Sequence, residues 1–178
     1  MLAGSYVEVR RDTLPAYEER IFRWANGADD RLRLPVRAIM QAGTFVTVPV
    51  IAAVAFLAGR RRLAARLLFA GTAAWFGAKA IKPLGGRDRP EGVLDGVRLR
   101  EGMEGDLGWI SGHTAVVTSI AWVLGEDLPE WTRPLLACVV AVTGFGRMYV
   151  GAHLPHDIVG GAGLGLMLGA ITPHDDAR

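Results

Sequence analysis

The chain has 178 residues, of which 51% are hydrophobic and 21% are charged, and its formal net charge is +2. This length is typical of a single domain. The charge is small and no basic stretch interleaves with aromatic residues, which argues against a nucleic-acid-binding protein. The single cysteine, Cys138, excludes a disulfide within the chain.

The N-terminal segment, residues 1–33, carries many charges and no early apolar core, so we expect no cleavable signal peptide. Residues 1–12 are expected to be loose. A short amphipathic helix is expected over residues 13–26 and should end at Gly27. Three apolar side chains fall on one face of this helix: Tyr17, Ile21 and Trp24. Such a face suits a membrane interface, and packing of the helix on the domain is the alternative.

Five apolar runs separated by charged clusters follow within residues 34–173, and each is expected to be a helix. They cover residues 38–59, 63–81, 111–125, 134–149 and 157–172. The first run has no charged residue and is long enough to cross the roughly 30 Å core of a bilayer. The others also fit buried helices of a soluble all-α domain. We favour an all-α membrane bundle of about five transmembrane helices, followed by a polar tail at residues 174–178.

The last apolar run contains a regular stripe of small residues. Gly161, Gly165 and Gly169 are spaced by four, so they share one face of a helix. Small residues at this spacing let two helices approach closely. We therefore expect this helix to pack tightly on a neighbour through its glycine face.

Between the last two runs, an arginine, a histidine and an aspartate stand at fixed spacing: Arg147, His153 and Asp157. Pro155 suits the first turn of a helix, which places Asp157 in that turn, about one turn after His153. The carboxylate could then accept a hydrogen bond from one imidazole nitrogen and leave the other free, as in a nucleophile or base held by a third group. Arg147 offers donors suited to phosphate or carboxylate. The alternative is a loop with a capping aspartate and surface histidines.

Two earlier segments carry related chemistry. Lys82, Arg89 and Pro90 lie around the start of a long charged loop, and Ser111-Gly112-His113 opens the third run. Backbone N–H groups at the start of a helix favour a phosphate. The three segments together hold three cations, two histidines and one carboxylate, a set poor in ligands for a metal but suited to phosphoryl transfer. Three other arginines of the chain are expected on a solvated, headgroup-binding or substrate-gating surface: Arg87, Arg98 and Arg100.

In this order and spacing, the three segments resemble the signature of the type 2 phosphatidic acid phosphatase (PAP2) superfamily, which reads K-x6-RP, PSGH and SR-x5-H-x3-D. The match covers Lys82 to Asp157, and the small size resembles bacterial members. There are two departures. Ile110 stands where the family usually has proline, and Gly146 stands where it usually has serine. Neither position carries one of the reacting groups.

The resemblance implies a role for each matched residue. His153 would attack phosphorus and form a phosphohistidine, and Asp157 would orient His153. His113 would protonate the leaving oxygen and then activate water. The phosphate oxygens would be held by Lys82, Arg89, Ser111, Gly112 and Arg147. The scheme requires no metal and no cofactor.

We therefore predict that residues 34–173 form a PAP2-like transmembrane catalytic domain that hydrolyses a lipid phosphate. Polyprenyl (di)phosphate is the first choice. The resemblance also fits phosphatidic acid, phosphatidylglycerol phosphate and polyprenyl-phosphoribose phosphate. The alternatives are a lipid phosphotransferase on the same fold and a non-catalytic membrane protein that binds a lipid phosphate.

The positions of the arginines indicate how the predicted spans are oriented in the membrane. Five spans would place all three motifs at one membrane surface and Arg60, Arg61 and Arg62 at the other. The positive-inside tendency then puts the catalytic face on the extracytoplasmic side of a bacterial inner membrane. The arginines before residue 38 argue for the opposite orientation. Membrane lipids are the expected surroundings, and the sequence does not indicate an oligomeric state.

Overall fold

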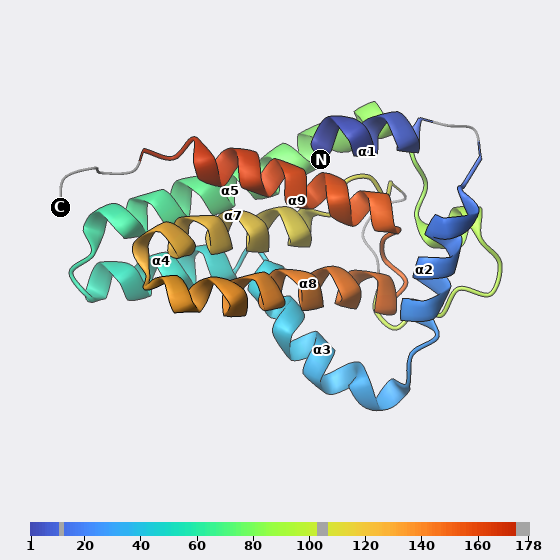
Figure 1. Cartoon of the computed structure of the whole chain (residues 1–178), viewed down its shortest axis with the longest axis horizontal. Coiled ribbons are helices and arrows are strands. Elements are labelled where there is room, and N and C mark those ends of the chain that lie inside the picture. The colour runs from blue at the N-terminus through green and yellow to red at the C-terminus, as the bar shows by residue number, and fades with distance from the viewer. Residues whose placement is uncertain (11–12, 103–106, 174–178) are drawn as a thin grey trace.

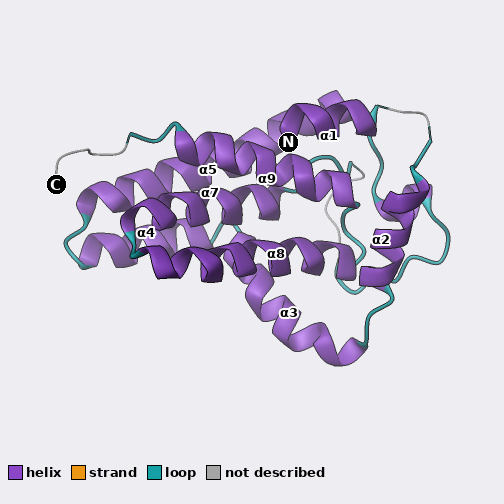
Figure 2. Ribbon diagram, in the orientation of Figure 1, coloured by secondary structure: helices purple, strands orange, loops and turns teal. Residues whose placement is uncertain are grey.

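Nine α-helices follow one another through residues 1–10, 13–102 and 107–173, which are the residues that the computed structural model describes. They are α1 (Leu2–Val9), α2 (Ala16–Asn26), α3 (Arg33–Met40), α4 (Thr47–Leu57), α5 (Arg61–Gly85), α6 (Pro90–Val93), α7 (Gly112–Asp127), α8 (Arg133–Tyr149) and α9 (Pro155–Ala170). Figure 2 shows helices joined by loops, without strands, over these residues. The predicted all-α class is confirmed, and the polar tail at 174–178 lies outside the described residues.

Helix α7 occupies the middle of the bundle. It packs against α9, α5 and α8, and the long helices run side by side in Figure 1. Their contacts bury Leu67, Ala74, Val116, Val123 and Leu164, each at 2% exposure or less. The ends of α7, α8 and α9 were predicted from their apolar runs to within about two residues. Helix α7 therefore places its first turn, with His113, at one end of a buried core.

The glycine stripe of α9 faces α7, as predicted. A Cβ atom on Gly161 would lie 2.4 Å from the Ser111 carbonyl oxygen, and one on Gly165 would lie 2.4 Å from the Ala115 carbonyl oxygen. Gly169 lies against α7 in the same way, further along the helix. Because the obstacles at the first two positions are backbone atoms, any larger residue there must push the two helices apart.

The expectation that residues 1–12 are loose was wrong. Residues 2–9 form α1, which packs along α9, and residues 11–12 lie outside the described residues. The hydroxyl of Ser5 donates to the Leu2 carbonyl at 2.8 Å and accepts from the indole N–H of Trp109 at 3.3 Å. This segment is ordered by tertiary contacts with distant residues, which its own sequence does not reveal.

The first apolar run, predicted as one helix over 38–59, is broken. Helix α3 ends at Met40, a 3-10 turn covers Gln41–Gly43, and α4 starts at Thr47. The hydroxyls of Thr44 and Thr47 both donate to the Gln41 carbonyl, at 2.8 and 2.5 Å. Side-chain bonds of this kind compete with the helical ladder and stabilise the bend.

The expected membrane spans can be compared with the length and apolar composition of the observed helices. Within the described residues, no single helix meets both requirements for crossing a membrane, and one bent pair, Asp30–Gly43 with Thr47–Leu57, meets them together at an angle of 68°. The second run also differs from its predicted bounds, because α5 continues through Pro83 to Gly85 and is capped by Gly86, which has a left-handed backbone.

The contact between α7 and α9 predicts the effect of adding one methyl group. Gly165→Ala should lower the free energy of unfolding by about 1–3 kcal/mol, because the new Cβ atom meets a backbone carbonyl. Gly77→Ala in α5 is the matched control, since its Cβ atom would make an ordinary 3.6 Å contact with Leu164. This control should be neutral or stabilise the helix by up to about 1 kcal/mol. Unfolding of the purified variants measures both, and equal melting of the two would contradict the close contact.

Candidate active site

The three motif segments meet at one end of the bundle, around a pocket of about 400 Å³. Its cationic and imidazole lining comes from α5, the start of α6, α7, α8 and the loop before α9: Lys79, Lys82, Arg89, His113, Arg147 and His153. Gly112 also lines it. Motif residues up to 71 positions apart in the sequence therefore face one cavity, as the motif spacing led us to expect.

Two of the eight predicted site residues do not line this pocket. Ser111 is fully buried, and its hydroxyl accepts hydrogen bonds from the backbone N–H of Thr114 at 3.4 Å and from the Thr114 hydroxyl at 3.0 Å. It therefore acts as the N-cap of α7. Asp157 is also fully buried and lies behind His153, where it contacts the histidine and not the cavity.

The histidine and aspartate have the predicted relation. Pro155 is the first residue of α9, and Asp157 lies in its first turn. Nδ1 of His153 is 3.4 Å from Oδ2 of Asp157, and the same oxygen accepts from the backbone N–H of Leu154 at 2.9 Å. Nδ1 of the imidazole is thus directed at the carboxylate, which leaves Nε2 as the nitrogen that does not face Asp157.

The environment of His153 favours its neutral form. Burial lowers the pKa of His153 well below its usual value, and the charges of Arg147 and Lys82 lower it further. The side chain is only 4% exposed. A neutral imidazole keeps one nitrogen with a free lone pair, which is the state needed for attack on an electrophile.

Two of the cations also fix the loops around the pocket. Nζ of Lys82 donates to the carbonyls of Leu107 and Gly108, both at 3.0 Å. Nη1 of Arg89 donates to the carbonyl of Ala152 at 3.0 Å, immediately before His153. The same side chains therefore supply positive charge and hold two separate loops in place, one at residues 107–108 and one at Ala152, next to His153.

The third cation has a carboxylate partner that sequence reasoning missed. Nη1 of Arg147 donates to Oε2 of Glu101 at 3.1 Å, and Glu101 lines the pocket. A glutamate in a long charged loop carries no distinguishing sequence signal. The expectation for Arg87 and Arg100 was also wrong, because their side chains are only 10% and 7% exposed. Both are engaged inside the protein.

The departure at Gly146 has a structural reason. A Cβ atom there would lie 2.5 Å from Cγ of Met40 and 2.9 Å from Cγ1 of Val36. Both residues belong to α3, which packs on α8 at this point. Gly146 is therefore a position of close approach between α3 and α8, and Met40 also lines the pocket. At the other departure, Ile110 is fully buried in the core.

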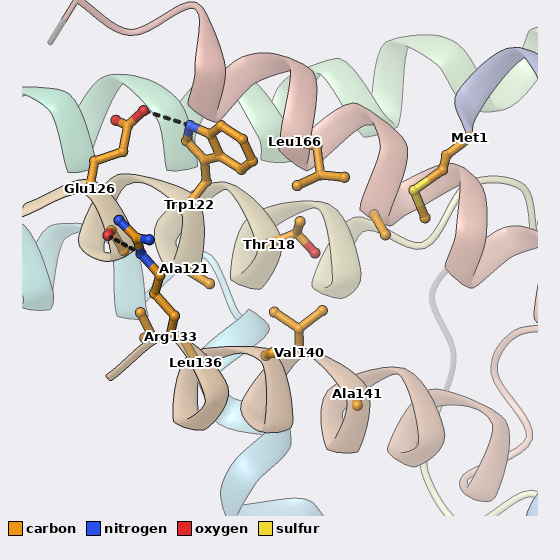
Figure 3. Close-up of a pocket in the computed structure, with 13 residues that line it drawn as sticks. Met1, Thr118, Ala121, Trp122, Glu126, Arg133, Leu136, Val140, Ala141 and Leu166 are labelled. Atoms are coloured by element: carbon orange, nitrogen blue, oxygen red, sulfur yellow. Dashed lines mark hydrogen bonds between the residues drawn. The ribbon is translucent and has the colours of Figure 1, made fainter. Parts of the chain in front are cut away.

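A larger pocket, of about 680 Å³, lies along α7, α8 and α9 (Figure 3). Its walls carry apolar side chains, including Trp122, Leu136 and Val140. Glu126 and Arg133 stand at one end, where the Trp122 indole donates to Glu126 at 3.0 Å. This groove lacks the concentration of cations that a phosphate requires, so the smaller pocket is the candidate site. Across the described residues, no group of three or more His, Cys, Asp or Glu could hold a metal ion.

The protein is thus an all-helical bundle with a cationic, anion-binding pocket next to a buried histidine–aspartate pair. The family model described as the PAP2 superfamily matches residues 63–177, and the chain belongs to that superfamily. The matched region includes all three motif segments. Residues 1–62, with α1 to α4, precede it.

Three known proteins resemble the chain. An undecaprenyl-diphosphatase from Sulfolobus acidocaldarius is 26% identical over 121 residues, which are 68% of this chain and 59% of that protein. The crystal structure of Aquifex aeolicus LpxE has a TM-score of 0.81 at 24% identity, covering 89% of this chain and 95% of the other. That of a transmembrane PAP2-type phosphatidylglycerolphosphate phosphatase from Bacillus subtilis has a TM-score of 0.74 at 20% identity, covering 96% and 90%. The two structures establish a shared fold.

The crowding at Gly146 predicts that the usual serine is not tolerated here. Gly146→Ser should lower the free energy of unfolding by about 1–3 kcal/mol, because its Cβ atom collides with Met40. In a Met40→Ala background the same change should cost less, since the nearer of the two obstacles has been removed and only Val36 remains. Unfolding of the four proteins in this double-mutant cycle measures the coupling. Additive losses would show that Met40 is not what excludes a side chain at position 146.

Proposed function

We propose that this protein is a membrane-embedded lipid phosphate phosphatase that works through a phosphohistidine on His153. The observation that supports this most strongly is the pocket lined by two histidines and four cationic side chains, three of which belong to the motifs. Membership of the PAP2 superfamily supports the same reading. The phosphoryl group passes from the lipid oxygen to a histidine nitrogen and then to a water oxygen. Positive charge stabilises it during both transfers, and this charge is supplied by Lys82, Arg89 and Arg147.

In the first step, Nε2 of His153 attacks phosphorus. A nitrogen–phosphorus bond forms while the bond from phosphorus to the lipid oxygen breaks, and His113 gives its proton to that oxygen. Asp157, 3.4 Å from Nδ1, holds the ring and stabilises the positive charge that the imidazole gains. The backbone N–H groups at Gly112 and His113, at the start of the 16-residue helix α7, add donors for the phosphate oxygens.

In the second step, water attacks the phosphohistidine. His113 takes a proton from this water, the nitrogen–phosphorus bond breaks, and inorganic phosphate leaves. Both histidines return to their initial states, so the cycle balances without a metal or another cofactor. The role given to Ser111 changes in this scheme, because its hydroxyl caps α7 and its backbone N–H donates to the Asp157 carbonyl at 2.9 Å. Ser111 therefore positions the start of α7 and does not hold the phosphate.

The surface of the bundle supports a lipid environment. Large apolar side chains on α4 and α5 are more than half exposed, among them Val50, Val54, Leu57, Phe69 and Phe76. An exposed apolar surface of this kind is typical of contact with a membrane or a partner. Helix α5, with 25 residues, is about 37 Å long, so it meets the length requirement for a span but not the requirement for apolar composition.

The substrate proposed first is a polyprenyl diphosphate or monophosphate. The resemblance to an undecaprenyl-diphosphatase supports it, although the chain spans only 59% of the length of that relative. We place the catalytic face on the extracytoplasmic side of a bacterial inner membrane. The reason is that Arg60, Arg61 and Arg62 lie at the start of α5, while Lys82 lies near its other end. In the same proposal the exposed face of α2 rests in the membrane interface.

The decisive experiment is a phosphate-release assay in detergent with a chelator present. Undecaprenyl diphosphate, phosphatidic acid and phosphatidylglycerol phosphate serve as substrates. His153→Ala and His113→Ala should each lower the rate by about a thousandfold or more, because each removes a reacting group. Arg133→Gln, at the far end of α8, should retain the wild-type rate.

Wild-type rates in both histidine variants would overturn the phosphohistidine mechanism. Product analysis separates the alternatives. A newly phosphorylated lipid in place of free phosphate would identify a phosphotransferase, and binding of lipid phosphate without turnover would identify a non-catalytic protein. Activity that disappears with chelator and returns with a divalent metal would contradict the metal-independent scheme.

A further inference from the structure

We infer that Glu18 and Arg87 are positioning residues for the nucleophile, and that helix α2 thereby forms part of the catalytic apparatus. The inference rests on the function proposed above, and it adds two residues that lie outside the three motifs. Glu18 also lies outside residues 63–177, the region matched by the family. Both side chains act on His153 through Asp157 and do not touch the pocket themselves.

Glu18 is a buried carboxylate in the first turn of α2, with 0% exposure. Its two oxygens accept from the two terminal nitrogens of Arg87, at 2.9 and 2.7 Å. One of these oxygens also accepts from the backbone N–H of His156 at 2.9 Å. This N–H belongs to the first turn of α9 and has no partner within the helix. Glu18 therefore ties the start of α9 to α2.

Arg87 reaches a second buried carboxylate. Its Nη1 atom, which already binds Glu18, lies 3.5 Å from Oδ1 of Asp157. The other oxygen of Asp157 faces His153 and the Leu154 N–H. The two oxygens of Asp157 thus have different partners, and the contacts run in sequence from Glu18 through Arg87 and Asp157 to His153.

Charge explains why this arrangement matters for the reaction. Arg87 is shared between two buried carboxylates, and the His156 ring lies 3.1 Å from Glu18 as well. The guanidinium therefore does not neutralise Asp157 alone, and negative charge remains on its His153 side. Without Glu18, Arg87 would be free to turn fully onto Asp157 and weaken its hold on the imidazole. Without Arg87, Glu18 would keep only its contacts with His156, and Oδ1 of Asp157 would lose its cationic partner. In either case the orientation of His153 would become less well defined, while the cations that line the pocket would remain in place.

The test compares Glu18→Gln with Glu19→Gln. Glu19 is the next residue of α2, but it is 39% exposed and pairs with Arg23. The phosphate-release assay should show kcat about ten- to a hundredfold lower for Glu18→Gln, with KM changed much less, because the nucleophile is misplaced while phosphate binding persists. Glu19→Gln should match the wild type. Arg87→Lys, which keeps the charge but loses the planar fork, should behave like Glu18→Gln.

The Asp157→Asn background distinguishes a positioning role of Glu18 from a purely structural one. If Glu18 acts through Asp157, adding Glu18→Gln to Asp157→Asn should lower kcat no further. A full additional loss would overturn the inference. Melting temperatures of all variants check that the fold is retained, and Arg87→Lys provides the answer if Glu18→Gln does not fold.

One readout does not depend on turnover. With ¹⁵N-labelled histidine, the ring signals of His153, identified by their loss in His153→Asn, should shift in Glu18→Gln and stay unchanged in Glu19→Gln. If the wild type hydrolyses no lipid phosphate, the proposed function fails and this shift still decides the positioning role. If the wild type is active, and Glu18→Gln matches Glu19→Gln in kcat and in the His153 signals, the positioning role is overturned and the function stands.

Discussion

Asp157 lies fully buried at the start of α9, where a carboxylate is stable only if its oxygens are paired. Its side chain is paired with Arg87, with the Leu154 N–H and with His153, and its backbone carbonyl accepts from the Ser111 N–H at 2.9 Å. The last bond joins the start of α9 directly to the start of α7. The side chain and the backbone carbonyl of Asp157 together thus join the start of α9 to Arg87, to the loop with His153 and to the residue that caps α7.

The approach of α9 to α7 makes this meeting possible. Gly161 leaves room for the Ser111 carbonyl at the site end, and Gly165 repeats the contact one turn further from it. Glycine is needed at the loop as well, because a Cβ atom on Gly108 would lie 3.0 Å from Oδ2 of Asp157. Close backbone packing, and not a larger set of side-chain contacts, sets the depth at which the histidine–aspartate pair is buried.

The parts that the sequence predicted are those with local signals. The apolar runs, Pro155 at the start of a helix and the spacing of His153 and Asp157 all depend on residues near one another in the chain, and the structure agrees with them. The parts that it missed depend on distant partners. The bond between Glu18 and His156 joins residues 138 apart, and nothing around Glu18 distinguishes it from the exposed Glu19. The broken first run has a local cause instead, because it reflects hydrogen bonds from the hydroxyls of Thr44 and Thr47 to the Gln41 carbonyl, which apolar composition does not record.

Residues that precede the family match complete the site from one side. A Cβ atom on Gly43 would lie 2.6 Å from the carbonyl oxygen of His113, so the bend between α3 and α4 rests directly on the start of α7. Met40, in the same bend, closes the pocket wall and occupies the space that a side chain at Gly146 would need. The loss of the usual serine is therefore coupled to the docking of α3. Because α3 and α8 both flank this cavity, a change at Met40 or at Gly146 alters the shape of the site. The two residues therefore form one structural unit.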